Sequence, residues 1–385
     1  MFEFMTAGES HGPGLVVIVT GMPAGLRISK DVIDRELLRR QKGTGRGGRM
    51  KIEKDEVEIL SGIRAGESIG SPIAMVIRNQ DWANWLDIMA QEENAVVAEE
   101  ISKPRPGHAD LAGIQKTGQQ DIRNILERSS ARETACRVAA GALAKRLLAE
   151  LGMTILCHVV QIGSVAAEYC SLPGIEEVKE IEDSNVRCLD SKAAKRMEDE
   201  IDKAKEEGDS LGGIFEVIAY GVPVGLGSYI SWDKRLDGGL ARSLMSIPAI
   251  KAVEIGGGFS SCARRGSEVH DEIFFESSRG FYRKTNRAGG LEGGMTNGEA
   301  LVLRAGMKPI PTLAKPLKTV DIKTKKSAEA FKERADVCAV PAAAVVGEGM
   351  VAIELASAVL KKFGGDSLEE LLCNYRNYLK RTKNL

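Results

Sequence analysis

The sequence lacks the features that mark membrane, secreted and metal-binding proteins. Its seven cysteines are odd in number and form no Cys-x-x-Cys pair, so neither a disulfide framework nor a zinc site is indicated. No apolar run approaches the length of a transmembrane helix, and residues 1–12 contain neither the basic nor the apolar segment of a signal peptide. We therefore expect a cytoplasmic protein with no bound metal and no membrane partner.

Aromatic residues and net charge are also low, which bears on nucleic-acid binding. Phenylalanine, tryptophan and tyrosine make up only 5 % of the chain, and the formal net charge is −1. Binding of nucleic acid through bulk positive charge is therefore disfavoured. Glycine is abundant instead, with 42 among 385 residues, and 43 % of residues are hydrophobic. This composition is typical of a soluble enzyme with a large core, in one domain or two, and many tight turns.

A long buried helix is predicted in the middle of the first half of the chain. Ser130 followed by Glu133 is the pattern of a capping box, in which each side chain accepts a hydrogen bond from the other residue's backbone N–H. Apolar residues then occupy most positions from 131 to 151, and Gly152 stands where a helix commonly ends.

Three arginines lie near the start of this predicted helix, which is electrostatically unusual. A helix N-terminus carries a partial positive charge and unpaired N–H groups, so it favours acidic residues over cations. The cluster is interpreted as the edge of an anion site, and the alternative is that nearby acidic residues pair with the arginines. The arginines are Arg123, Arg128 and Arg132, and the acidic residues are Asp121, Glu127 and Glu133.

A glycine-rich basic segment follows a predicted helix at residues 30–40. Residues 39–51 contain six basic side chains and no acid, so the segment is a solvated surface, a nucleic-acid patch or a clamp for a small anion. It has no aromatic residues on which bases could stack, which weakens the nucleic-acid interpretation. Its glycines let Arg40, Arg46 and Arg49 wrap around an anion. We expect the segment to be mobile until ligand binds.

Two histidines stand where glycine allows close approach to a ligand. His11 lies between Ser10 and a glycine, just before a predicted strand at residues 15–19. His108 follows a Pro-Gly pair, and Asp110 is near enough in sequence to orient its ring. Each histidine is either catalytic or an ordinary turn or structural residue.

Further elements follow from the spacing of apolar residues. The segment at 280–298 contains six glycines and is either a loop that approaches a ligand or a flexible surface loop. Residues 308–312 form a rigid turn, and Arg334 and Asp336 either serve a ligand or form a local ion pair. No Gly-x-Gly-x-x-Gly follows a predicted strand, so a dinucleotide site has no support.

The other predicted elements are strands at 57–62, 72–77, 154–160 and 214–227 and helices at 193–207, 236–245 and 345–363.

Nine motifs follow one another from Gly8 to about Ala342: GESHGPG, RRQKGTGRGGRM, RPGHADLAG, ERSSARETACRVAAGALA, GVPVGLGSYISWDKRLD, SIPAIKAVEIGGGF, NRAGGLEGGMTNGE, KPIPT and RADVCAVPA. Together they resemble the motifs of the chorismate synthase family. Nine motifs in order are far more specific than any one of them. The resemblance implies a single α+β domain over residues 1–385, with long central helices sandwiched between antiparallel β-sheets, and a homotetramer.

The resemblance also implies a reaction and its ligands. Phosphate is lost from 5-enolpyruvylshikimate 3-phosphate by anti-1,4-elimination to give chorismate, in the shikimate pathway of aromatic amino acid biosynthesis. Reduced FMN is required without net redox change, and NADPH enters only as a reductant of the flavin. Because the substrate and the flavin phosphate are anionic, the arginines would form a clamp. The implied substrate-binding residues are Ser10, Arg40, Arg46, Arg49, Arg105, Arg132 and Arg334.

Three residues would carry the chemistry by the same resemblance. His11 would protonate the leaving phosphate, His108 would support the anionic reduced flavin, and Asp336 would help to shuttle a proton from the flavin. The implied flavin contacts are Arg128, Ser129, Ser130, Pro248, Ala249, Gly293, Lys308, Pro309, Ile310, Pro311, Thr312 and Arg334.

The chain departs from the family's usual pattern at three positions. Pro248 stands where many members have asparagine, Thr117 where an aromatic residue is usual, and Ala335 where the residue is usually larger or polar. Two other functions remain open: a polyanion-binding protein, with a steep dependence on salt, and a flavin oxidoreductase that consumes NADPH.

Overall fold

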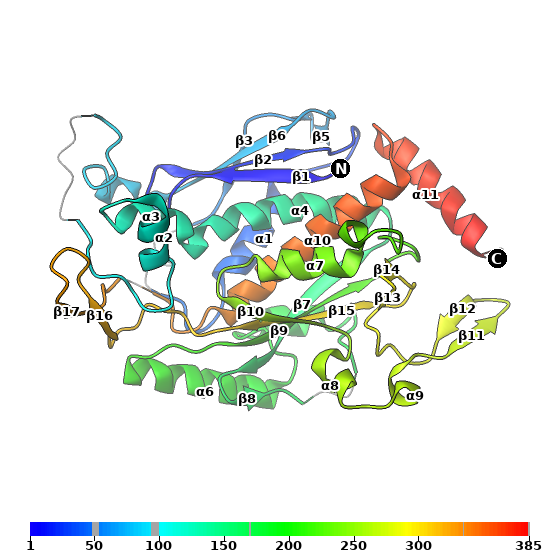
Figure 1. Ribbon diagram of the computed structural model, residues 1–385. Coiled ribbons are helices and arrows are strands. Elements are labelled where there is room, and N and C mark those ends of the chain that lie inside the picture. The colour runs from blue at the N-terminus through cyan, green and yellow to red at the C-terminus, as the bar shows by residue number, and fades with distance from the viewer. Residues whose placement is uncertain (48–53, 94–99, 169–170, 334, 384–385) are drawn as a thin grey trace.

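The protein has three layers, with helices between two antiparallel sheets (Figure 1). The computed structural model describes residues 1–47, 54–93, 100–168, 171–333 and 335–383. This arrangement confirms the expected α+β architecture, in which long central helices are covered on both sides.

The first sheet has the strand order β1–β2–β6–β3, and every neighbouring pair is antiparallel. Leu15, Val17 and Val19 alternate along the second strand and are buried, because one face of the sheet packs on the helices. The strands are β1 (Glu3–Ala7), β2 (Gly14–Thr20), β6 (Ile73–Arg78) and β3 (Val57–Ile59).

The second sheet has the order β10–β15–β9–β7–β8 and is also antiparallel throughout. Its side chains Val159, Phe215 and Leu303 belong to the same hydrophobic cluster as the helices and the first sheet. The strands are β10 (Ile250–Ile255), β15 (Leu301–Met307), β9 (Gly213–Tyr220), β7 (Thr154–Ile162) and β8 (Val165–Ala166).

The helices α4 (Thr134–Glu150) and α10 (Val340–Phe363) cross at a contact between two glycines. A Cβ on Gly141 would lie 2.5 Å from the Cα of Gly349, so a larger residue would force the helices apart. By length and composition, α10 could cross a membrane. The expectation that no apolar run approaches the length of a transmembrane helix is therefore wrong for this segment. However, 83 % of its most apolar window is buried inside the protein, where both sheets need an apolar partner.

The remaining elements complete the helical layer and surround the sheets. The helices are α1 (Lys30–Gln41), η2 (Gln80–Asn84), α2 (Asp110–Thr117), α3 (Arg123–Ser129), η3 (Ala131–Glu133), α5 (Val178–Asp183), α6 (Ser191–Glu207), η4 (Trp232–Lys234), α7 (Leu236–Met245), α8 (Gly258–Cys262), α9 (Gly266–Val269) and α11 (Leu368–Lys383). The short strands are β4 (Ile63–Arg64), β5 (Glu67–Ser68), β11 (Ile273–Glu276), β12 (Gly280–Arg283), β13 (Leu291–Glu292), β14 (Met295–Thr296), β16 (Lys318–Val320) and β17 (Ser327–Glu329).

The predicted capping box at the start of the long helix is not formed. The helix begins with the 3₁₀ turn η3, in which the Ser130 hydroxyl accepts from the N–H of Arg132 at 3.3 Å. The Glu133 carboxylate instead accepts from Thr6 and Arg137. The 3₁₀ turn and these contacts with Thr6 and Arg137 together prevent Glu133 from bonding back to the N–H of Ser130.

The glycine-rich segment 280–298 is also more regular than a loop. It contains β12 and the hairpin β13–β14, whose two turn residues are Gly293 and Gly294. Their φ angles are 58° and 82°, the left-handed values that a two-residue hairpin turn favours. Glycine therefore serves tight turns here.

Candidate active site

A cavity of about 500 Å³ opens where the start of α4 meets the end of α1 and loops from both sheets. This volume suits a small-molecule ligand. Among the described residues, its charged lining consists of Arg40, Arg46, Arg105, Arg132, Lys308, Glu333 and Asp336. Uncharged polar residues such as Ser10, Ser130 and Thr312 also line it. Its apolar lining includes Leu126, Ile247, Pro248, Met307, Ile310 and Val346.

Two of the predicted clamp arginines share one buried carboxylate. Arg132 Nη1 lies 2.5 Å from Asp55 Oδ1, and Arg40 Nη1 lies 3.3 Å from Asp55 Oδ2. Burial is the main cause that lowers the pKa of Arg40 to about 10; Asp55 opposes it, while Arg46 and Arg132 add to it. Arg40 and Arg132 both line the cavity, so an anion there would be stabilised by two buried guanidinium groups.

Arg40 and Arg132 meet because the end of α1 packs against the start of α4. Arg40 is in the last turn of α1, where it donates to the carbonyl oxygen of Ala131 at 3.1 Å and to Thr134 Oγ1 at 3.0 Å. These contacts fix the end of α1 against the start of α4. Arg132 Nε donates to Asn79 Oδ1 at 3.0 Å.

Arg46 and Asp336 form an ion pair at the cavity, with 2.5 Å between Nη1 and Oδ2. The backbone N–H of Gly47 donates to Asp336 Oδ1 at 2.6 Å. Asp336 is therefore bound by Arg46 and Gly47 of the basic segment 39–51. It also lies two residues after Arg334 in the sequence. Arg334 and Arg49 lie outside the described residues, and the expected mobility of segment 39–51 stays a prediction.

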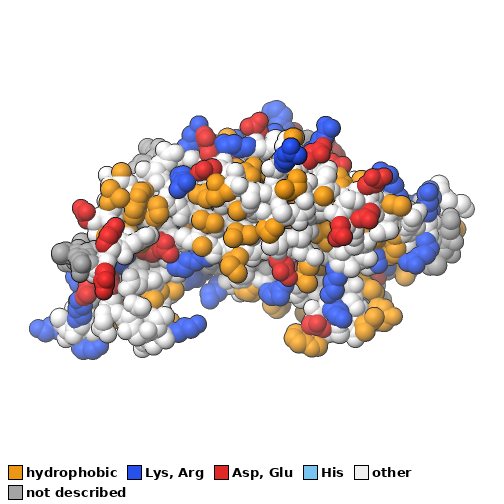
Figure 2. Space-filling model, turned by 90° about the horizontal axis from the view of Figure 1, so that it is seen from above, with side chains coloured by type: hydrophobic (Ala, Val, Ile, Leu, Met, Phe, Trp, Pro, Cys, Tyr) orange, Lys and Arg blue, Asp and Glu red, His pale blue; other side chains and the backbone are white. Residues whose placement is uncertain are grey.

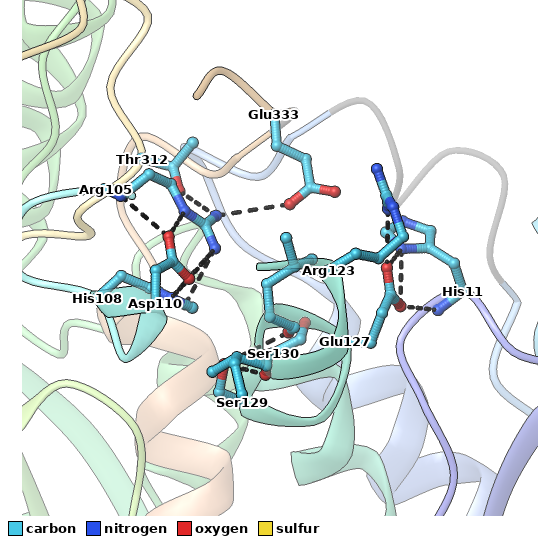
Figure 3. A network of polar contacts seen from close by, with 12 residues as sticks. His11, Arg105, His108, Asp110, Arg123, Glu127, Ser129, Ser130, Thr312 and Glu333 are labelled. Atoms are coloured by element: carbon cyan, nitrogen blue, oxygen red, sulfur yellow. Dashed lines mark hydrogen bonds and ion pairs between the residues drawn. The ribbon is translucent and has the colours of Figure 1, made fainter. Parts of the chain in front are cut away.

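Asp110 holds Arg105 and His108 together (Figure 3). His108 Nδ1 lies 2.5 Å from Asp110 Oδ1, and Arg105 Nε lies 2.9 Å from Oδ2. Burial would raise the pKa of Asp110, but hydrogen bonds from His108 and Arg105 hold it well below its ordinary range. The prediction that Asp110 orients His108 is confirmed, and Gly107, with a φ of 81°, makes the turn before it.

The rigid turn at 308–312 packs against this group. Arg105 Nη1 donates to Thr312 Oγ1 at 2.9 Å, and Lys308 Nζ donates to the carbonyl oxygen of Gly107 at 2.5 Å. Glu333 Oε2 lies 3.5 Å from Arg105 Nη1. Its Oε1 is buried without a hydrogen-bond partner among the described residues.

His11 belongs to a second polar group, to one side of the first in Figure 3. Its Nδ1 lies 2.9 Å from Glu127 Oε1, and its ring stacks on Trp85 with 3.7 Å between ring centroids. Arg123 Nη1 also contacts Glu127 Oε1, at 3.1 Å, so the local-pairing alternative is correct for this arginine. It is wrong for Arg132, which pairs with Asp55.

Most of the predicted site residues gather at the cavity, and a few do not. Arg128 is exposed and donates to the carbonyl oxygens of Gly8 and Thr6. Gly293 lies in the β13–β14 turn, away from the lining, and neither Pro309 nor His11 is among the lining residues. Those at the cavity are Ser10, Arg40, Arg46, Arg105, His108, Ser129, Ser130, Arg132, Pro248, Ala249, Lys308, Ile310, Pro311, Thr312 and Asp336.

Several polar residues of the site were missed from sequence. Asp55 lies four residues after the end of the basic segment, and an acid near that segment is the available signal. Glu127 was considered only as a partner of the arginines. Nothing in the sequence pattern indicates Asn79, Trp85 or Glu333.

Comparison with known proteins gives a consistent result. The sequence model of the family described as chorismate synthase matches residues 2–360. A chorismate synthase from Desulforudis audaxviator (strain MP104C) is 56 % identical, over 100 % of this chain and 98 % of that protein. One from Desulforamulus reducens (strain ATCC BAA-1160 / DSM 100696 / MI-1) is 59 % identical, over 96 % of each. A crystal structure of chorismate synthase superposes with a TM-score of 0.81 at 43 % identity, covering 100 % of this chain and 99 % of the other.

Sequence identity above one half over nearly the whole length, together with a matching fold, leaves one assignment. The chain belongs to the chorismate synthase family of lyases.

Proposed function

We propose that the chain eliminates phosphate from 5-enolpyruvylshikimate 3-phosphate by anti-1,4-elimination and releases chorismate. The observation that carries this proposal is the charge of the cavity, where five cationic and two acidic side chains line the described part. A substrate with two carboxylates and a phosphate has the complementary charge. The planar guanidinium groups suit paired contacts with these oxygens.

The apolar wall of the same cavity fits the ring system of reduced FMN. Pro248 lines this wall, so the residue that replaces the usual asparagine adds apolar surface. Ala249 has a φ of 68°, and its carbonyl oxygen accepts from the N–H of Lys308 at 2.9 Å, which fixes the wall to the rigid turn. When bound, reduced FMN supplies electron density that eases the departure of phosphate.

The residues of the chain bind and move protons in this proposal. Arg40, Arg46, Arg105 and Arg132 hold the anionic groups and keep the reacting bonds in place. The C3–O bond to phosphate breaks and a hydrogen leaves C6. His11 gives a proton to the leaving phosphate. His108, in the orientation that Asp110 sets, would stand beside the flavin, and Asp336 would help to shuttle a proton from it.

We also propose that residues 1–385 act as one catalytic domain, in a cytoplasmic homotetramer. One hydrophobic cluster joins both sheets and the helices. Figure 2 looks onto the outer face of the first sheet, where hydrophobic side chains lie among charged ones, and the cross-strand partners Met5 and Ile18 are exposed. Trp232 is 86 % exposed. Exposed apolar surface of this kind is typical of protein interfaces.

Light scattering on the purified chain tests the assembly. The expected mass is four times that of one chain, because the exposed apolar side chains would then be covered. A single-chain mass at micromolar concentration would contradict the tetramer.

An anaerobic assay tests the reaction. The protein is mixed with 5-enolpyruvylshikimate 3-phosphate and chemically reduced FMN, without NADPH, and chorismate and phosphate are followed. Equal release of both is expected, because the elimination has no net redox change. Formation only with NADPH and oxidised FMN would mean that the chain also reduces its flavin. No product in either mixture would contradict the proposal.

A further inference from the structure

We propose that Glu127 is a positioning residue that sets the tautomer and orientation of the His11 ring. This inference rests on the proposed function, in which His11 gives a proton to the leaving phosphate. It adds a residue outside the cavity lining whose task is to keep His11 competent for that transfer.

Glu127 contacts the segment around His11 through three of its oxygen atoms. Oε1 lies 2.9 Å from His11 Nδ1, and Oε2 accepts from the backbone N–H of His11 at 2.8 Å. The carbonyl oxygen of Glu127 accepts from the N–H of Ser10 at 3.0 Å. Ser10 lines the cavity, so these contacts tie the histidine to the edge of the site.

The other surroundings restrict the ring in the remaining directions. Trp85 stacks on it with 22° between the ring planes, and Trp85 Nε1 donates to Asp81 Oδ2 at 3.1 Å. The guanidinium of Arg123 lies 5.1 Å from the Trp85 ring and pairs with Glu127. His11 is 7 % exposed. A ring held on its face and at one nitrogen has little freedom to turn.

The chemistry of the contact assigns the protons. Burial would raise the pKa of Glu127, but hydrogen bonds from His11 and the charge of Arg123 hold it below its ordinary value. An ionised carboxylate only accepts hydrogen bonds, so Nδ1 of His11 carries a proton. The proton for phosphate then comes from Nε2, and the ring is left neutral with its proton on Nδ1.

Glutamine at this position would invert the arrangement. The backbone N–H of His11 always donates, so the single amide oxygen would take the place of Oε2. The amide NH₂ would then take the place of Oε1, which is the nearer of the two oxygens to Nδ1, at 2.9 Å against 3.1 Å. Two donors would then oppose each other whenever Nδ1 carries a proton. The variant Glu127→Gln keeps the shape of the side chain. It changes this pairing and also removes the charge that pairs with Arg123.

The chain contains a matched control in a second buried histidine–glutamate pair. His158 Nε2 lies 3.0 Å from Glu216 Oε1, and both side chains are almost fully buried on the second sheet. Neither residue lines the cavity. Glu216→Gln therefore removes the same charge from the same kind of pair without touching His11.

The experiment compares the wild type with Glu127→Gln and Glu216→Gln in two measurements. Turnover with reduced FMN gives kcat, KM and flavin affinity. Nitrogen-15 NMR of histidine-labelled protein reports which ring nitrogens carry protons, and only four histidines contribute signals. For Glu127→Gln we expect kcat to fall about 10- to 100-fold, with KM and flavin affinity within about twofold, and the Nδ1 signal of His11 to lose its proton-bound shift.

Each outcome decides the proposal. Glu216→Gln should keep kcat within about twofold and change only the His158 signals. An unchanged His11 signal in Glu127→Gln, or an equal loss of kcat in both variants, would overturn the inference. If Glu127→Gln does not fold, Glu127→Asp replaces it and should keep the Nδ1 proton signal. A wild type without turnover would remove the proposed function, while the ring signals would still decide whether Glu127 sets the tautomer.

Discussion

Replacing His11 with alanine should lower turnover about 10²- to 10⁴-fold while the purified protein still binds FMN, because general acid catalysis contributes in this range. The ring is buried against Trp85 and Glu127, so the change also removes packing. Flavin affinity, followed by quenching of FMN fluorescence, separates loss of chemistry from loss of the site. Turnover is measured anaerobically with reduced FMN and saturating substrate.

The control for this variant is His270→Ala. His270 is exposed at the end of α9 and lies outside the cavity lining, so wild-type turnover is expected. If His11→Ala retained wild-type turnover with intact flavin binding, His11 would have no part in the mechanism. The same result would also contradict the proposal that Glu127 positions His11 for proton transfer.

Glu348→Gln should destabilise the fold by about 1–3 kcal/mol, because it removes the buried carboxylate that Arg39 and Lys145 share and leaves them only Glu36 and Glu182 as partners. Glu348 is 1 % exposed and accepts two hydrogen bonds from Arg39, at 2.9 and 2.8 Å, and a further one from Lys145. Burial would raise the pKa of Glu348, but Arg39 and Lys145 hold it well below its ordinary range. Urea unfolding at neutral pH measures the loss.

This pKa direction also predicts a dependence on pH. A carboxyl whose pKa is lower in the folded state stabilises the protein above its ordinary pKa of about 4.3, and this stabilisation is lost as pH falls toward the folded value. The difference in unfolding free energy between wild type and Glu348→Gln should therefore shrink as the pH is lowered below about 5.

A surface carboxylate supplies the control. Glu150 pairs with Arg146 one turn away on α4, and both side chains are partly exposed. Glu150→Gln should cost less than about 1 kcal/mol, with no comparable change on acidification. Equal stability of the two variants would show that Glu348 is not the balancing charge of the core network.

The parts of the fold that follow from local pattern were predicted well. Alternating and helical periods of apolar residues predict the elements now seen as β2, α1, α6 and α7, with ends within one or two residues. The α10 helix begins five residues earlier than predicted, because Val340 and the following alanines are buried between the two sheets. The short hairpins β4–β5 and β11–β12 were missed, since each strand has only two to four residues.

Site residues close in sequence were also predictable. Asp110 contacts His108, which is only two residues away in the chain. The Pro-Gly turn before His108 also keeps Arg105 within a few residues of both. Contacts between distant segments were not predictable in this way. Asp336 pairs with Arg46, 290 residues away, and Glu127 reaches His11 over 116 residues.

Residue order was sufficient to predict several of the helices and strands, the supply of arginines and the family resemblance, because these depend on periods and motifs within short stretches. Which acid balances which arginine could not be read in this way, because Asp55 meets Arg40 and Arg132 only when α1 packs beside α4. That packing also buries the charges, and burial strengthens the attraction between the guanidinium groups and an anionic ligand.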